Sequence, residues 1–170
     1  MGEFFLVSVV LVEATLREKL KNRLLRLEAR NGKGLLKWNG SSFEIRICYL
    51  RGLFQIRELY GCLHFYYINN SSDYSNIKAH AIVRALKNIT QPYRVTILID
   101  GFLTKKEERI ISQVLHKSKI RFRKIRGLRT SDCFMRLADT LAGFLRDHME
   151  EQDYTGEIYS WLIRTGSLIE

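Results

Sequence analysis

The sequence predicts a single α/β domain over residues 1–170, with helices packed on a mixed sheet. Its 170 residues fit one domain of ordinary size. The chain holds one proline and no linker rich in glycine and serine, so a boundary between two domains is not indicated. From residue 62 onward, strand-like and helix-like segments alternate, which is typical of crossover units around parallel strands. A hydrophobic content of 46% excludes a compositionally disordered chain.

The chain opens with an apolar segment followed by an amphipathic one. Residues 4–12 are apolar at nearly every position, as expected of a strand that is covered on both faces inside a sheet. Thr15 is then expected to cap a helix, because leucines recur every three or four residues as far as Leu27 with charged residues between them. The sequence Asn-Gly-Lys-Gly at residues 31–34 ends this helix.

The next three elements are predicted with different clarity. A helix is expected to start after Ser41 or Ser42 and to reach about Leu50, although the alternating apolar residues there also fit a strand. Residues 62–68 are rich in aromatic and β-branched side chains and predict a strand. Apolar residues four positions apart predict a helix over residues 77–89.

The clearest strand covers residues 94–101, which are apolar almost throughout and end in Asp-Gly. Thr104 is expected to cap a helix over residues 105–117, whose first turn carries two glutamates that favour the helix dipole. Residues 120–125 then predict a basic strand, because cationic and apolar side chains alternate there.

A long helix is predicted to close the domain. Ser131 or Asp132 can cap it, and an apolar stripe continues to about Glu151. A short helical extension follows from about residue 152 and includes a helix over residues 156–163.

The chain is strongly basic, with 28 Lys and Arg against 18 Asp and Glu and a formal net charge of +10. This balance favours a polyanionic partner, nucleic acid before an anionic membrane. No apolar run approaches the about 20 residues of a membrane span, and the opening segment lacks a signal-peptide pattern. Three widely spaced cysteines and four scattered histidines show neither zinc-ligand nor triad spacing. We therefore expect a cytoplasmic protein that binds no membrane and keeps its thiols reduced.

Asp100 is the first candidate for chemistry, because ligands of parallel sheets bind beyond the carboxyl ends of the strands. A carboxylate held there by rigid backbone suits a magnesium or manganese ion. An Asp-Gly pair is also common in simple turns, so a purely structural role remains an alternative.

Asp139 is the second candidate and lies on the predicted closing helix, at the border of its apolar face. An acid in that position needs a partner to offset its desolvation. A metal ion would serve, and so would a structural ion pair with Arg136 or Arg146, which lie three and seven residues away.

The densest cationic run provides a candidate nucleic-acid surface, because no acidic residue lies between Arg109 and Ser131. In a strand, Arg121 and Arg123 point to one side and form a basic ridge that can neutralise phosphates, with Arg126 beyond them. Protection of an edge strand by charge is the alternative interpretation. Three tyrosines could stack bases or simply pack against the protein, namely Tyr66, Tyr67 and Tyr74.

Three motifs carry a family resemblance: Gly-Leu-Leu-Lys-Trp at residues 34–38, the strand ending in Ile-Asp-Gly at residue 101, and Arg-Leu-Ala-Asp-Thr-Leu-Ala-Gly at residues 136–143. Over roughly residues 4–148 the chain resembles the prokaryotic family called domain of unknown function 3800. That family is regarded as ribonuclease H-like, within the retroviral integrase superfamily. The resemblance implies a ribonuclease H-like fold.

The resemblance also implies a candidate chemistry, a metal-dependent nuclease that hydrolyses DNA or RNA with magnesium or manganese. Asp100 and Asp139 match the family's acids and would hold the metal, while Lys37 matches the lysine of a Lys-Trp motif. Arg121, Arg123 and Arg126 would then position phosphates.

One departure from the family affects these expectations. Family members begin with a strand that ends in Asp-Glu-Ser-Gly and supplies the first metal-binding acid, and this chain opens at what would be the next strand. Asp100 and Asp139 alone would hold metal weakly, since two-metal centres need several converging carboxylates. The alternatives are a degenerate nuclease, a non-catalytic nucleic-acid-binding or interaction module with the same fold, and a sheet completed by a second copy or by a partner chain.

Overall fold

The computed structural model describes residues 4–69, 73–87, 89–128 and 132–169, which form a mixed α/β structure. The chain packs as two compact units. In the described residues, the first unit combines residues 4–9 with residues 66–128, and the second combines residues 10–65 with residues 132–169. Each unit is therefore assembled from two separate stretches of chain. None of the described helices has both the length and the apolar character needed to cross a bilayer.

Three strands form one sheet in the order β1 (Phe4–Val10), β2 (Leu63–Asn69) and β5 (Leu168–Ile169). β2 and β5 are parallel, with Leu63 opposite Leu168. β1 is an edge strand of this described sheet, and all its residues are half-buried. The expectation that this apolar segment lies inside a sheet is thus wrong. The carboxyl-terminal extension holds the predicted helix and also the strand β5, which has too few residues for a periodic signal.

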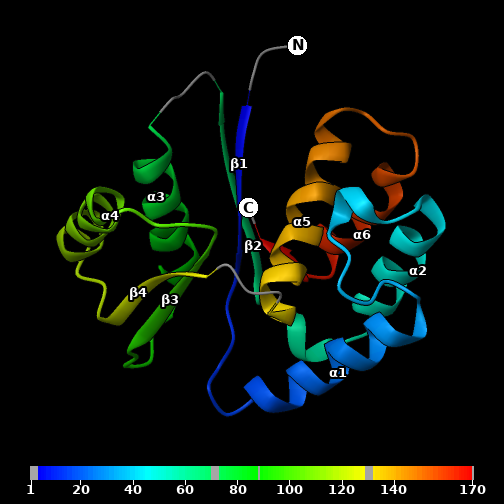
Figure 1. The fold of residues 1–170 in the computed structure, drawn as a ribbon, viewed down its shortest axis with the longest axis horizontal. Coiled ribbons are helices and arrows are strands. Elements are labelled where there is room, and N and C mark those ends of the chain that lie inside the picture. The colour runs from blue at the N-terminus through cyan, green and yellow to red at the C-terminus, as the bar shows by residue number, and fades with distance from the viewer. Residues whose placement is uncertain (1–3, 70–72, 88, 129–131, 170) are drawn as a thin grey trace. The chain divides into compact units, whose positions relative to one another are not determined.

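Besides most of β1 and the end of β2, the first unit contains a pair of parallel strands and two helices, which Figure 1 shows in green and yellow-green. The strands are β3 (Val95–Asp100) and β4 (Phe122–Leu128), and the helices are α3 (Tyr74–Leu86) and α4 (Lys105–Lys117). The helices pack against each other. Thr104 caps α4 as predicted, since its hydroxyl accepts a hydrogen bond from the Glu107 backbone N–H (3.2 Å) while the Glu107 carboxylate accepts from the Thr104 N–H (2.9 Å).

β3 is buried on one face only. Ile97 is buried, whereas its neighbours Thr96 and Leu98 are exposed. The alternation of burial places Thr96, Leu98 and Asp100 on a common open face. The nearly apolar sequence of β3 therefore did not reveal that one face of this strand is exposed.

The second unit is almost entirely helical. Ser42 caps α2 by accepting a hydrogen bond from the Ile45 N–H, and Asp132 caps α5 by accepting one from the Phe134 N–H (2.9 Å). Thr15 caps nothing, because α1 starts two residues later behind Leu16, which contributes no side-chain cap. The helices of this unit are α1 (Arg17–Arg30), η1 (Trp38–Gly40), α2 (Phe43–Leu53), η2 (Arg57–Leu59), α5 (Cys133–Met149) and α6 (Thr155–Arg164).

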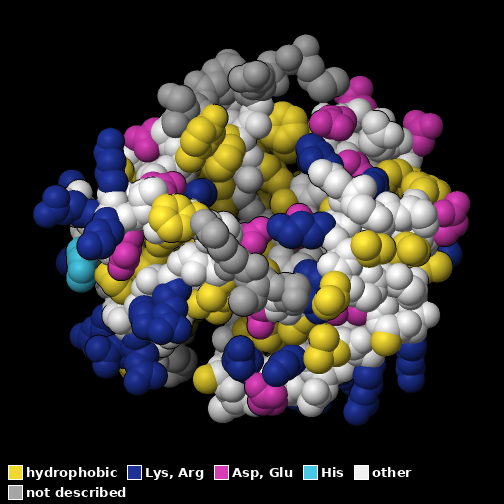
Figure 2. Space-filling model, viewed as in Figure 1, with side chains coloured by type: hydrophobic (Ala, Val, Ile, Leu, Met, Phe, Trp, Pro, Cys, Tyr) yellow, Lys and Arg dark blue, Asp and Glu magenta, His cyan; other side chains and the backbone are white. Residues whose placement is uncertain are grey.

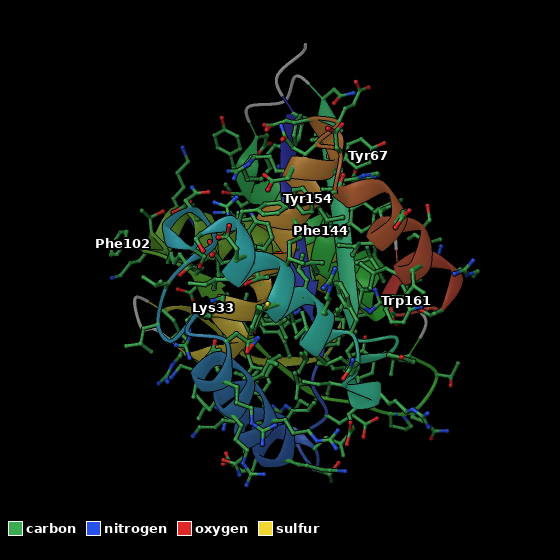
Figure 3. The ribbon with its side chains drawn as sticks, turned by 90° about the vertical axis from the view of Figure 1, so that its right-hand side faces the viewer. Lys33, Tyr67, Phe102, Phe144, Tyr154 and Trp161 are labelled. Carbon is green, nitrogen blue, oxygen red and sulfur yellow. The ribbon has the colours of Figure 1, made fainter. Side chains whose placement is uncertain are left out.

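The core of the second unit contains a buried ion pair between α1 and α5. The Arg136 guanidinium donates two hydrogen bonds to the Glu28 carboxylate, with N–O distances of 2.8 and 2.5 Å, and both side chains are almost fully buried. Both helices also bury leucines, among them Leu24 of α1 and Leu141 of α5, and Figure 3 labels the buried Phe144 of α5. A bidentate pair of this kind offsets the desolvation of both charges only while both partners are present.

Trp38 occupies a notch that Gly143 leaves in α5. Trp38 is 2% exposed, and a Cβ placed on Gly143 would lie only 2.2 Å from the indole Cγ. On its other side, the Arg46 guanidinium lies 4.8 Å from the centre of the ring, a cation–π contact. The glycine of the Ala-Gly motif is thus required for close packing and not for backbone freedom.

We expect Gly143→Ala to destabilise the protein by about 1–3 kcal/mol, because the added methyl overlaps the buried indole and the ring has no space to retreat. Urea unfolding followed by tryptophan fluorescence measures the change. Gly156→Ala in α6 is the matched control, because a Cβ there meets nothing within 4 Å, and it should be neutral or stabilising by up to about 1 kcal/mol. If the two variants were equally stable, the conclusion that Gly143 makes room for the indole ring of Trp38 would be wrong.

His64 is buried in β2 beside the short strand β5, where it pairs with Ile169. One ring nitrogen, Nε2, contacts the Gly61 carbonyl oxygen at 3.1 Å and so carries the proton in the neutral ring. Burial lowers the pKa of His64 below its usual value, because the charged imidazolium would lose its hydration.

This lowered pKa predicts a loss of stability in mild acid. As the pH falls below about 6.5, the unfolded chain takes up a proton at this position before the folded chain does, so the free energy of unfolding decreases until the folded pKa is passed. We expect the decrease between about pH 7.5 and 5.5 to be smaller in His64→Gln than in the parent, and unchanged in the exposed His80→Gln. Urea unfolding at both pH values tests it, and an identical decrease in all three proteins would refute it.

Candidate nucleic-acid interface

The cationic side chains predicted for this region lie along β4 and the residue that precedes it. We call Arg121, Arg123, Lys124 and Arg126 the β4 basic strip, and all four are exposed. Figure 2 shows Lys and Arg side chains gathered around the β4 and α4 side of the first unit. The strip belongs to the stretch without acidic residues, so it carries four like charges close together.

A β-bulge determines how the strip is displayed. Val95 pairs with Phe122 but Thr96 pairs with Lys124, so Arg123 is an extra residue in β4. The bulge lets Phe122 and Ile125 both turn toward the covered side although they are three residues apart. With strict alternation of side chains, Arg121 and Arg123 would be the cations on the exposed side. Because of the bulge, Lys124 and Arg126 are exposed as well.

The carboxyl end of the β3–β4 pair carries Asp100, which is exposed and lies opposite Leu128. Gly101 follows with a backbone φ of 95°, a left-handed conformation that favours glycine. The chain then crosses β4 so closely that a Cβ on Gly127 would approach the Gly101 carbonyl oxygen at 2.7 Å and the Leu103 nitrogen at 2.8 Å. Asp100 therefore lies directly before a turn that packs closely on β4.

Asp139 has a defined structural partner in the second unit. Its carboxylate accepts a hydrogen bond of 2.7 Å from the backbone N–H of Trp38. The expected partners are engaged elsewhere, since Arg136 binds Glu28 and Arg146 donates to the Asn39 side chain. Pairing with either arginine was thus the wrong interpretation for Asp139. Two of the motifs that carry the resemblance, residues 34–38 and residues 136–143, thus meet at Trp38. Asp139 binds the backbone N–H of this tryptophan.

Asp147, one helical turn beyond Gly143, anchors the same tryptophan through its side chain. Its carboxylate accepts hydrogen bonds from the Trp38 indole N–H (3.1 Å) and from the Tyr154 hydroxyl (2.6 Å), and Arg46 lies 3.5 Å away. Burial, together with the neighbouring Asp147 carboxylate, raises the pKa of Tyr154. The sequence analysis missed Asp147, although its spacing of eight residues from Asp139 places both acids on one face of the helix.

Lys37 precedes this tryptophan and is exposed at the start of η1. It belongs to the second unit, whereas the β4 basic strip belongs to the first. The buried lysine of this loop is Lys33, which donates a hydrogen bond of 2.6 Å to the Leu36 carbonyl and lies over the Tyr49 ring. Burial lowers the pKa of Lys33. Lys33 therefore shapes the loop, and Lys37 presents a charge at its surface.

The magnesium or manganese centre that the resemblance implies would be held by Asp100 and Asp139. Asp100 lies in the first unit and Asp139 in the second. Throughout the part of the chain that the structure describes, no three His, Cys, Asp or Glu side chains are grouped so that they could hold a metal ion.

The predicted stacking residues differ in their packing and in their exposure. Tyr74 contacts the Phe5 ring with centroids 4.5 Å apart, and the Arg84 guanidinium lies 5.0 Å from the centre of the Tyr66 ring. Tyr67 is 38% exposed. The most exposed aromatic residue in the described chain is Phe102, at 68%, directly after the Asp100 turn. No periodic pattern marks it, and its only sequence signal is an apolar residue between a turn glycine and a helix cap.

Comparison of the chain with protein-family models, curated proteins and solved structures gave no match.

The contact with the Trp38 backbone predicts how Asp139 responds to substitution. Asp139→Asn keeps an oxygen that can accept the Trp38 N–H, so stability should change by less than about 1 kcal/mol. Asp139→Ala leaves that N–H without its partner and should cost about 1–3 kcal/mol. Urea unfolding distinguishes the two, and equal destabilisation by both variants would mean that the negative charge itself is what the fold requires.

Proposed function

We propose that this protein binds nucleic acid through the β4 basic strip, as a non-catalytic module. The observation that carries the proposal is the display of four exposed cations on one strand, within a stretch that has no acidic residue to neutralise them. Phosphates satisfy such a surface without requiring a particular base sequence. The formal charge of +10 adds long-range attraction for a polyanion.

The geometry of the strip supports phosphate binding over simple edge protection. Protection of a strand edge requires only charged side chains that discourage pairing, without a particular arrangement. Here a bulge inserts an additional arginine, Arg123, and turns Lys124 outward beside it. Three of the four cations are arginines, whose planar guanidinium groups can donate two hydrogen bonds to one phosphate.

This proposal predicts binding that weakens steeply with salt and does not need a divalent metal. Reversing Arg123 and Arg126 to Glu should lower the affinity at least tenfold and reduce the slope of log K against log salt by about 1 to 2 units, because at least two phosphate contacts are lost. Fluorescence anisotropy with a labelled oligonucleotide in EDTA measures both quantities. Reversing the exposed Arg26 and Arg51 of the second unit is the control for net charge alone. Equal effects of the two double variants would argue against the strip.

The metal-dependent nuclease, in a ribonuclease H-like arrangement, is the second candidate. It is favoured by the position of Asp100, exposed at the carboxyl end of a parallel strand beside Arg126 of the strip. Adding magnesium or manganese to the same binding mixtures separates the two candidates. A nuclease cleaves the oligonucleotide and loses this activity in Asp100→Asn, whereas a binding module leaves it intact and binds as well or better once that negative charge is removed.

A further inference from the structure

Phe102 is held in place by packing of the backbone on both sides of it. Gly101 and Leu103 both approach Gly127 within the space that a Cβ would need, so the turn lies directly on β4 next to Arg126. Thr104 then starts α4 with a complete capping box, which fixes the chain two residues beyond Phe102. The ring is thus presented from a rigid turn at the carboxyl end of the two parallel strands.

This ring is displayed to solvent, as Figure 3 shows, where Phe102 projects outward from the ribbon. A second exposed apolar residue, Leu98, lies opposite Arg126 in the register of the two strands and is 38% exposed. Arg126, Leu98 and the turn that carries Phe102 are therefore neighbours at this end of the two strands. Stacking surfaces beside cations are typical of proteins that bind single-stranded nucleic acid.

We infer that the ligand of the β4 basic strip is a single strand, with an unpaired base stacked on Phe102 and the flanking phosphates on Arg126 and Lys124. The inference rests on the nucleic-acid binding proposed above. An unpaired base exposes its flat face to an aromatic ring, whereas bases inside a duplex are already stacked on each other. Lys124 and Arg126 are two residues apart on β4, about 7 Å, so successive phosphates of an extended strand can reach both.

The test compares Phe102→Ala with the parent on two probes of one sequence, a single-stranded DNA of about 20 nucleotides and the duplex made from it. We expect the variant to bind the single strand about tenfold more weakly and the duplex as before, because only the unpaired base stacks on the ring. Phe102→Trp should restore single-strand binding. Phe43→Ala in α2 is the matched control, since that phenylalanine is 54% exposed, and it should alter neither affinity.

The outcomes separate this inference from the proposed function. If the parent binds neither probe in a salt-dependent manner, the nucleic-acid proposal itself fails. If the parent binds and Phe102→Ala leaves both affinities unchanged, or lowers both equally, the single-strand inference fails while the basic strip stands. If each variant unfolds at the same temperature as the parent, loss of the fold is excluded as the cause. We expect this result because Phe102 contributes little buried area.

Discussion

The packing of Trp38 against Gly143 is the constraint on which the second unit depends. One indole ring connects the loop after α1, the start of α2 through Arg46, and the middle of α5, and it does so in a space that only a glycine leaves open. Asp139 accepts a hydrogen bond from the backbone N–H of Trp38, and Asp147 accepts one from its indole N–H. A buried N–H without an acceptor costs free energy, so both carboxylates stabilise the fold.

The packing of Trp38 against Gly143 also explains how two of the sequence motifs are related. The Lys-Trp pair and the Arg-Leu-Ala-Asp segment lie about a hundred residues apart in sequence, and they are in contact because one supplies a ring and the other its notch. Periodicity predicted the helix that carries Asp139 and the strand that ends in Asp100, but no pattern shows which group an acid faces. The partner of Asp139 is a backbone N–H, which has no side-chain signature in a sequence.

Local signals predicted the elements well where the physics is local. Thr104, Ser42 and Asp132 cap their helices because each side chain bonds an N–H two or three residues away. The bulge at Arg123 and the edge position of β1 depend instead on strand pairing, which a single strand's sequence does not encode. Phe102 was missed for a related reason, since its exposure follows from the crossing of its turn over Gly127.

The β4 basic strip has an energetic consequence for the first unit. Four exposed cations on neighbouring positions repel one another, and the stretch of sequence that holds them contains no acid, although Asp100 lies at the end of the neighbouring strand β3. In the folded state, the bulge and the parallel pairing hold the charges together, whereas in the unfolded chain they move apart. A bound polyanion therefore relieves more repulsion in the folded state than in the unfolded chain. Any ligand that binds the folded state preferentially also stabilises it. The repulsion among the cations of the strip therefore favours the binding of a polyanion to it.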